Sequence, residues 1–316
     1  MINYPIISLI VPCFNESENI NYCLNTLNAI LRDLINRNEI SEKSFIYFVD
    51  DGSTDGTWQI IQKASDKINN IKGLRLSKNF GHQNALLAGI QEVLELCDAS
   101  ISIDADLQQD PYAIEKFINE FKLGYDLVLG VRKDRKTESF FKRHSARFFT
   151  NLMKSMGAEI ISGHADYRLM SKRSMREIQI LKDPNIFIRG MIHKIGFNYS
   201  IVYFNVTERI AGVSKYSFRK LVRLAIAGST TMSTTPLRII ASIGFISFLV
   251  FIINILFLVI AKFLGNPIQP GWISVVASIY LVGALQIISI AIIGEYIAKI
   301  FKATLNYPRW IIKDKI

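Results

Sequence analysis

The residues best suited to chemistry follow a short apolar run, in the stretch SISIDADLQQDP. Asp104 and Asp106 lie one residue apart, so in an extended strand their side chains point to the same side. Two such carboxylates repel each other unless a cation lies beside them. Mg²⁺ and Mn²⁺ prefer oxygen ligands and complete their shells with substrate phosphates, and Gln108 offers a further oxygen. We therefore predict a metal–diphosphate site. A turn of capping acids is the alternative, and it explains Asp110 and Pro111 but not the first two carboxylates.

Two earlier strand-like segments also end in acidic turns. The first ends in VPCFNESEN, with Glu16 beyond the strand, and the second ends in VDDGSTDGT, with Asp50 and Asp51 at its tip. Gly52 permits the second turn, and a polar side chain after it can cap the next helix. An acidic turn with a cap would explain this motif alone. Acids at two neighbouring strand tips favour a nucleotide site, because a carboxylate can accept hydrogen bonds from a base or a ribose.

The elements that must position these motifs alternate between strand-like and helix-like patterns. Short apolar strands alternating with helices predict an α/β fold, with a mostly parallel sheet and helices on both faces. Ligands of such sheets bind at the carboxyl ends of the strands. The expected strands are 7–13, 44–50, 73–77, 99–105 and 125–131, and the expected helices are 17–36, 56–69, 83–96 and 111–122.

Two stretches without a charged residue, 239–261 and 272–294, follow this domain. Each is roughly 34 Å long as a helix at 1.5 Å per residue, enough to cross a hydrocarbon core of about 30 Å. Buried core helices are the alternative, but two such stretches rarely share a soluble domain. Lys and Arg residues flank both stretches on their outer sides, and the connecting hairpin contains only Lys262. This bias predicts a multi-pass protein of the cell membrane with both termini cytoplasmic.

The segment before the first stretch combines an apolar face with flanking Arg and Lys residues and has no acids. This pattern favours a helix in the membrane interface, the alternative being an amphipathic helix on the soluble domain. The expected parts are a cytoplasmic catalytic domain (1–213), interfacial helices (214–238), a transmembrane hairpin (239–296) and a basic cytoplasmic tail (297–316).

The formal net charge of +10 could indicate nucleic acid, but the basic residues gather near the two apolar stretches. Anionic lipid headgroups or phosphorylated substrates fit that distribution better, and we expect no nucleic-acid partner. The three cysteines are unevenly spaced and suggest no disulfide framework. The N-terminal apolar run is too short for a signal peptide and lacks a basic start.

The motifs VPCFNE, VDDGSTDGT, KNFGHQNALLAG, DADLQQDP, DYRLMS and ERIAGVSKYS occur in this order, followed by the two apolar stretches. This arrangement resembles family 2 glycosyltransferases with the GT-A (Rossmann-like) fold. Within that family it resembles the branch that acts on polyprenyl phosphates, which includes bactoprenol glucosyltransferases and dolichyl-phosphate mannose synthases. The resemblance covers essentially the whole chain. In one place it departs, because many relatives read DLQDP or DLQHPP where this chain reads DLQQDP.

The resemblance implies roles for individual residues. The metal would lie at Asp104, Asp106 and Gln108, and Asp166 would face the donor sugar and the acceptor as the candidate base. The residues implied for the nucleotide sugar are Pro12, Glu16, Asp50, Asp51, Ala105 and Asp106. Those implied for phosphate or acceptor binding are Arg132, Lys142, Arg143, Arg209, Ser214 and Lys215. His82 forms no metal spacing with the other histidines, and we considered it a weaker candidate for contact with the donor.

The resemblance further implies transfer of a hexose from a nucleotide sugar to a polyprenyl phosphate, with inversion and with Mg²⁺ or Mn²⁺. Glucose, UDP and undecaprenyl phosphate are favoured, and membrane tetramers in the family imply a homo-oligomer. The acceptor phosphate is mostly dianionic at neutral pH, since its second pKa is about 6. Asp166 is therefore expected to orient the acceptor or stabilise positive charge on the sugar more than to remove a proton. The alternatives are a processive polysaccharide synthase and a catalytically silent, nucleotide-sugar-binding membrane anchor.

Overall fold

The structure is a computed structural model. The residues that it describes are 4–133, 163–180, 196–205, 271–305, 307–316 and short pieces between 240 and 264. The chain forms two compact units, which we describe separately. The first is an α/β unit of residues 1–150, 159–216 and 307–316, and the second consists of residues 151–158 and 217–306.

Four parallel strands form the centre of the sheet in the order β4-β1-β2-β3. All seven residues of β1 are buried, as expected for a strand covered on both faces. These strands confirm four of the segments expected from the sequence, with ends that differ by up to three residues. Their bounds are Ile7–Cys13 for β1, Phe45–Asp50 for β2, Ile71–Leu76 for β3 and Ala99–Ser102 for β4.

Four more strands extend this sheet on both sides, giving the order β7-β5-β6-β4-β1-β2-β3-β8. Strand β6 runs antiparallel to β4 and β5, β7 is parallel to β5, and β8 is antiparallel to β3. The sheet is therefore mixed, with a parallel centre. Only β5 was expected from the sequence. The bounds are Leu127–Arg132 for β5, His164–Ser171 for β6, Tyr199–Phe204 for β7 and Ile312–Lys315 for β8.

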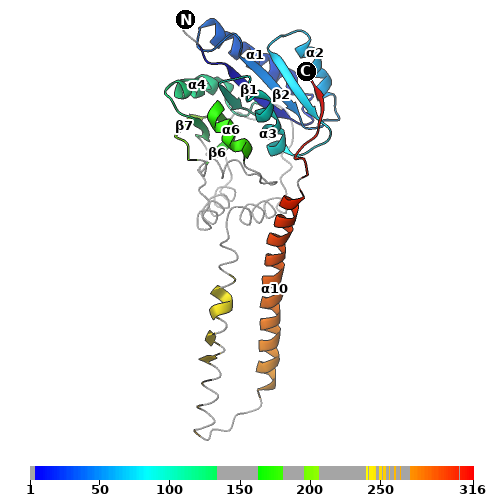
Figure 1. The fold of residues 1–316 in the computed structure, drawn as a ribbon, viewed down its shortest axis with the longest axis vertical. Helices are drawn as coiled ribbons and strands as arrows, with labels where there is room; N and C mark the ends of the chain where they lie inside the picture. The colour runs from blue at the N-terminus through cyan, green and yellow to red at the C-terminus, as the bar shows by residue number, and fades with distance from the viewer. Residues whose placement is uncertain are drawn as a thin grey trace. The chain divides into compact units, whose positions relative to one another are not determined.

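Helices cover both faces of the sheet, which confirms the expected layers (Figure 1). The helices α1, α2 and α4 contribute apolar residues to one core, and α3 and α6 contribute to the other. Helix α1 buries Leu24, Leu27, Leu31 and Leu34, a spacing of three to four residues that places them on one face. The bounds are Ile20–Asn36 for α1, Thr57–Ser65 for α2, His82–Val93 for α3, Ile114–Lys122 for α4 and Lys172–Ile180 for α6.

Strand direction brings the motifs to one edge of the sheet. The parallel strands β1, β2 and β4 end at this edge, and β5 also ends there because β6 reverses direction between β4 and β5. Strand β6 consequently begins at the same edge. In the β4–β6 register Ser102 pairs with Arg168. Continuing that register places Asp104 opposite Asp166, so residues far apart in the sequence meet beyond the end of β4.

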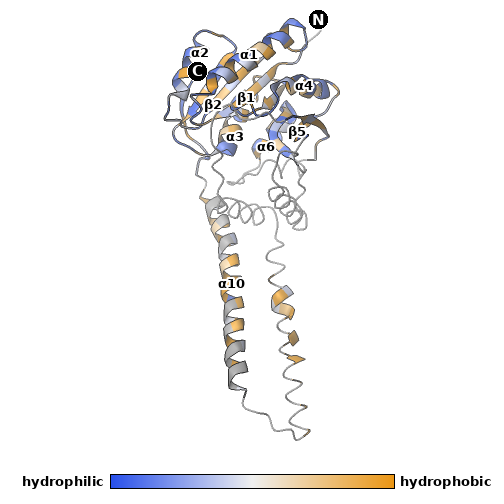
Figure 2. Ribbon diagram, turned by 180° about the vertical axis from the view of Figure 1, so that it is seen from behind, coloured by the Kyte–Doolittle hydropathy of each residue, from blue (hydrophilic) through white to orange (hydrophobic). Residues whose placement is uncertain are grey.

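In the second unit, α10 spans Trp272–Thr304 and contains the expected second apolar stretch. Among the described residues, this is the one helix long and apolar enough to cross a membrane, through the window Leu281–Ala298. Its described residues are mostly apolar (Figure 2). The expected first span is described only in separate short pieces, and the expected interfacial helix lies wholly outside the described residues. One candidate span is therefore found where the sequence predicts two.

Candidate active site

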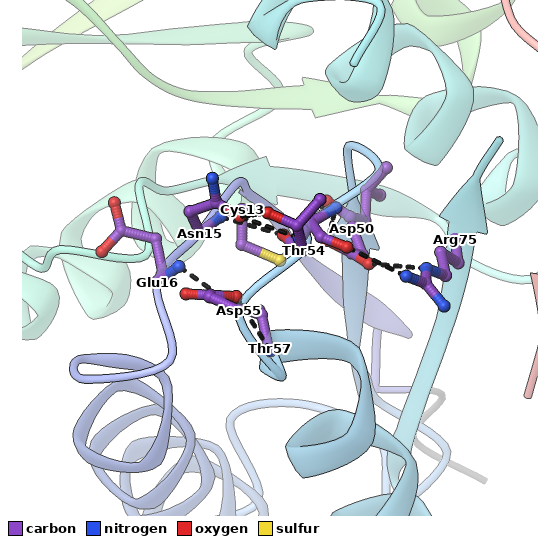
Figure 3. Close-up of polar contacts among 10 residues, drawn as sticks. Cys13, Asn15, Glu16, Asp50, Thr54, Asp55, Thr57 and Arg75 are labelled. Atoms are coloured by element: carbon purple, nitrogen blue, oxygen red, sulfur yellow. Dashed lines mark hydrogen bonds and ion pairs between the residues drawn. The ribbon is translucent and has the colours of Figure 1, made fainter. Parts of the chain in front are cut away.

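The loops after β1 and β2 are joined by hydrogen bonds (Figure 3). The backbone N–H of Asn15 donates to Ser53 Oγ at 2.9 Å, and the Asn15 side-chain oxygen accepts from the backbone N–H of Thr54 at 2.9 Å. Asn15 has a φ of 54°, a left-handed conformation that asparagine tolerates better than most residues. The two strand tips are thereby held as one rigid corner of the site.

Asp55 strengthens this corner and begins α2. Its carboxylate accepts hydrogen bonds from the backbone N–H of Ser17 at 3.0 Å and from the Thr57 hydroxyl at 2.6 Å. Burial alone would raise the pKa of Asp55, but the hydrogen bonds from Thr57 and Ser17 outweigh it and lower the pKa to about 2. Gly56 is the N-cap residue of α2, and Asp55, one residue before it, ties the loop after β1 to the first residue of the helix.

Asp50 lies at the end of β2, and its side chain is fully buried. One carboxylate oxygen accepts from the backbone N–H of Ser53 at 3.1 Å, and the other lies 3.3 Å from Nε of Arg75. Burial raises the pKa of Asp50 above its usual value, although the Ser53 hydrogen bonds and the Arg75 charge oppose this rise. Its carboxylate therefore holds the turn and the neighbouring strand together.

Asp51 connects β2 to the start of α3. Its two oxygens accept the backbone N–H groups of Phe80, at 2.7 Å, and Gly81, at 2.9 Å. Burial raises the pKa of Asp51, and these two hydrogen bonds oppose the rise. Gly81 has a φ of 91°, in the region that favours glycine, so the turn depends on its backbone freedom. Asp51 therefore holds the turn of Asn79, Phe80 and Gly81, which we call the NFG turn.

The other residues expected to hold the nucleotide sugar lie at the same edge. Pro12 pairs in register with Val49 inside the sheet. The carboxylate of Glu16 accepts a hydrogen bond from Asn19 and points away from Asp55 and Thr57 (Figure 3). Ala105 is buried after β4. The nucleotide contacts of these residues stay predictions.

The turn after β4 fixes the carboxylates of Asp104 and Asp106, which we call the DxD pair; the turn that contains them is the DxD turn. The side-chain amide of Gln109 accepts from the backbone N–H of Asp104 at 3.1 Å and donates to its Oδ2 at 2.6 Å. Asp106 accepts from the backbone N–H of Gln108 at 3.2 Å, and Leu107 has a φ of 46°. Gln109, the second glutamine of DLQQDP, is almost fully buried. Its two hydrogen bonds therefore fix the position of Asp104.

The next residues end the turn as the sequence suggested. Asp110 accepts a hydrogen bond from the backbone N–H of Tyr112 at 3.0 Å and caps the short 3₁₀ helix Pro111–Ala113, in which Pro111 is the first residue. The capping interpretation is therefore confirmed for this acid and proline. It does not extend to the half-exposed carboxylate of Asp104.

Asp166 lies near the start of β6 with its side chain 7% exposed. Its Oδ1 forms an ion pair with the fully buried guanidinium of Arg168, two residues along the same strand. Its Oδ2 accepts from the side-chain amide of Gln83 at 3.3 Å. Strand β6 and the first turn of α3 therefore fix both carboxylate oxygens.

His82 lies between the two acidic groups of this edge. Its Nε2 is 3.7 Å from Oδ1 of Asp104 and 3.6 Å from Oδ2 of Asp166. The imidazole is 41% exposed and the Asp104 side chain 37% exposed, so both border open space. The structure thus brings Asp104 and Asp166 together around one imidazole.

The expected phosphate and acceptor ligands are mostly outside the described residues: Lys142, Arg143, Arg209, Ser214 and Lys215. Arg132 is described; it is exposed at the end of β5, on the same edge of the sheet as Asp104. No motif in the sequence indicated a role for Arg168 or Gln83, and the departure at Gln109 had no clear role. Two residues apart on a strand point to the same side, so DYR could have predicted the Asp166–Arg168 pair.

Comparisons with known proteins decide the family. Residues 8–179 match the profile of glycosyl transferase family 2. The chain belongs to this family. It is 41% identical to the uncharacterized glycosyltransferase YkoT of Bacillus subtilis, over 98% of this chain and 91% of the relative. It is 35% identical to the bactoprenol glucosyl transferase of Shigella phage SfX, over 98% of this chain and 99% of the relative. These relatives confirm the branch that the motifs indicated.

Among solved structures, the chain is similar to glucosyl-3-phosphoglycerate synthase from Mycobacterium tuberculosis, determined with Mn²⁺, UDP and phosphoglyceric acid. The identity is 15%, over 72% of this chain and 78% of that chain, with a TM-score of 0.48. A likeness at this level carries no argument about the reaction.

Proposed function

We propose that this glycosyltransferase moves a hexose from a nucleotide sugar to a polyprenyl phosphate at the cytoplasmic face of a membrane. The observation that carries the proposal is the meeting of Asp104 and Asp166 at one sheet edge, in a family 2 chain that also contains an apolar helix long enough to span a bilayer. Glucose and undecaprenyl phosphate are the first candidates, because a full-length relative is named a bactoprenol glucosyl transferase. UDP is our first choice of nucleotide.

The donor set at the DxD turn fits a hard divalent cation. Asp104, Asp106 and Gln108 offer oxygen atoms, which Mg²⁺ and Mn²⁺ prefer. This donor set has only two carboxylates, since its third member is a glutamine. Within the described part of the chain, no cluster of three or more His, Cys, Asp or Glu side chains that could hold a metal is found. The donor diphosphate would complete the coordination. When bound, the cation would neutralise the charge of the leaving diphosphate.

In the proposed reaction, a phosphate oxygen of the lipid forms a bond to the anomeric carbon as the bond to the nucleotide diphosphate breaks. One in-line displacement inverts the anomeric centre, so an α-linked donor gives a β-linked product. The Asp166 carboxylate, fixed by Arg168 and Gln83, would stabilise the positive charge that develops on the sugar. It would also orient the acceptor, which needs little help in losing a proton.

The test of this function is a synthesis. Purified full-length protein is incubated with undecaprenyl phosphate, Mg²⁺ or Mn²⁺ and a panel of nucleotide sugars. The masses of the lipid products are then measured by mass spectrometry. We expect the mass of one hexose added to the lipid phosphate. A polymer formed without lipid would support a processive synthase instead. Nucleotide-sugar binding without turnover would support a silent membrane anchor.

The proposed topology places the α/β unit and both termini in the cytoplasm, with the hairpin outside. Single cysteines introduced at Asn266 and Ser41 test it. The native Cys13, Cys23 and Cys97 are buried, and burial raises the thiol pKa of all three, so their background labelling should be low. A membrane-impermeant reagent added to intact cells should label position 266 and leave position 41 unlabelled. The reverse pattern would refute this topology.

A further inference from the structure

The motif KNFGHQNALLAG has no role in the reaction described above, although it forms the turn before α3 and most of that helix. Its NFG turn is held by Asp51 through the backbone N–H groups of Phe80 and Gly81. The two residues after Gly81 begin α3 and are the ones whose side chains reach Asp166. The turn is therefore a rigid link between β2 and the active-site carboxylate on β6.

The side chain of Gln83 makes one hydrogen bond within the described part of the chain. Its Nε2 donates to Oδ2 of Asp166 at 3.3 Å, whereas its Oε1 is buried and accepts no hydrogen bond. A carboxylate accepts, so the contact fixes which end of the amide faces Asp166. Burying an acceptor without a donor costs stability, and such a cost is typical of functional sites.

The surroundings of Asp166 show what this hydrogen bond controls. Arg168 holds Oδ1 from the same strand. Gln83 holds Oδ2 from a different element, and the His82 ring lies 3.6 Å from the same oxygen on the side of Asp104. The plane of the carboxylate is set by both contacts together.

The geometry points to Gln83 as a positioning residue, which acts through Asp166 and fixes that carboxylate relative to the DxD turn. The inference rests on the proposed transfer to a polyprenyl phosphate, because it concerns the same site. Gln83 affects the chemical step without contributing to nucleotide binding. The His82 Nε2 lies within 4 Å of both acids, 3.7 Å from Asp104 and 3.6 Å from Asp166.

A double-mutant cycle tests this role. The variants are Gln83→Met, Asp166→Asn and the pair, with transfer to undecaprenyl phosphate measured at saturating substrates. Met has similar length and no hydrogen-bond donor. We expect Gln83→Met to lower kcat about tenfold, the loss of one hydrogen bond to a charged group, with KM for the nucleotide sugar within about twofold. In the Asp166→Asn background the same change should have almost no effect.

Gln91→Met is the matched control, because Gln91 lies exposed on the same helix. It should leave kcat unchanged, and calorimetric binding of UDP should show that every variant is folded. Additive losses in the cycle, or a Gln83→Met enzyme with full kcat, would overturn the inference while the proposed function stands. A folded wild-type protein that transfers no sugar to the lipid would overturn both.

Discussion

Acidic residues lie at the ends of two neighbouring pairs of strands, and they are used differently. At the tip of β2, beside that of β1, Asp50 and Asp51 are buried; backbone N–H groups bind both oxygens of Asp51 and one oxygen of Asp50, whose other oxygen faces Arg75. At the ends of β4 and β6, the Asp104 side chain is 37% exposed, and a side-chain amide, not a backbone loop, holds Asp166 Oδ2. The first two acids hold the loops together, and we propose that the second two face the bound substrate.

The partners of a carboxylate help to separate structural acids from candidate functional acids in a site of this kind. A carboxylate that satisfies backbone donors is needed whether or not a ligand is present, and its removal costs stability. A partly exposed carboxylate such as that of Asp104 is better placed to bind a cation or a ligand. Substitutions in the two regions should therefore separate loss of activity from loss of stability.

The largest effect is expected for Asp106→Asn at the DxD turn. Because the change removes a charge aimed at the leaving diphosphate, we expect lipid glycosylation to fall about a thousandfold. The melting temperature should stay within a few degrees of wild type. Excess chelator should abolish wild-type activity as well. Full activity in either experiment would exclude the metal assignment.

Asp166→Asn should lower turnover about a hundredfold, because it removes the charge that orients the acceptor and stabilises the sugar. The remaining activity should follow ionisation of the lipid phosphate near pH 6 in both forms. The measurement is the pH profile of turnover at saturating substrates, with chemistry confirmed as rate-limiting. An acid limb that belongs to the wild type and disappears in the variant would mean that Asp166 is a true general base.

Asp51→Ala should act on stability. The change leaves two backbone N–H groups without their acceptor, so the free energy of unfolding should fall by about 2 kcal/mol. Chemical denaturation of the detergent-solubilised protein measures it, with Asp106→Asn as the control from the other region. Unchanged stability together with weaker UDP binding would instead make Asp51 a nucleotide ligand, as the family resemblance implies.

The smallest effect is expected at Asp55, which is exposed just before α2. Asp55→Asn should lower the free energy of unfolding by about 1 kcal/mol or less near neutral pH. The folded pKa of about 2 lies below the unfolded value of about 3.9, so the stabilisation is complete above pH 4 and is lost as the pH falls through 2. Melting temperatures of wild type and variant should converge over that range. A difference as large at pH 2 as at pH 7 would contradict this assignment.

The sequence was sufficient for features that depend on local pattern. Alternating apolar segments predicted β1 to β5, whereas the function assigned to Asp104 and Asp106 from their spacing stays a prediction. The strands β6, β7 and β8 were missed because their pairing depends on distant partners, as when β6 runs back between β4 and β5. Acids such as Asp51 could not be assigned from type and position, since the deciding fact is that Phe80 and Gly81 donate to it.

Contacts around Asp166 show the same limit in the site. The resemblance named Asp166, but Gln83 reaches it from α3, which only the fold brings close, whereas Arg168 lies two residues along the same strand. Gln109 was noticed as a departure from the usual motif, and its clamp on Asp104 became clear only from the turn geometry.

Strand β8 has a consequence for anyone who wishes to express the α/β unit alone. The chain forms α10 first and then returns to pair with β3, where Gly73 and Ile316 exchange two backbone hydrogen bonds. A protein shortened ahead of α10 would lack this strand and leave the outer edge of β3 unpaired, while β2 still pairs with its inner edge. An unpaired edge is a template for aggregation. Lys313, Asp314 and Lys315 give β8 the charges that guard a natural sheet edge. A soluble version should therefore carry residues 307–316, joined by a flexible linker that replaces the apolar segments.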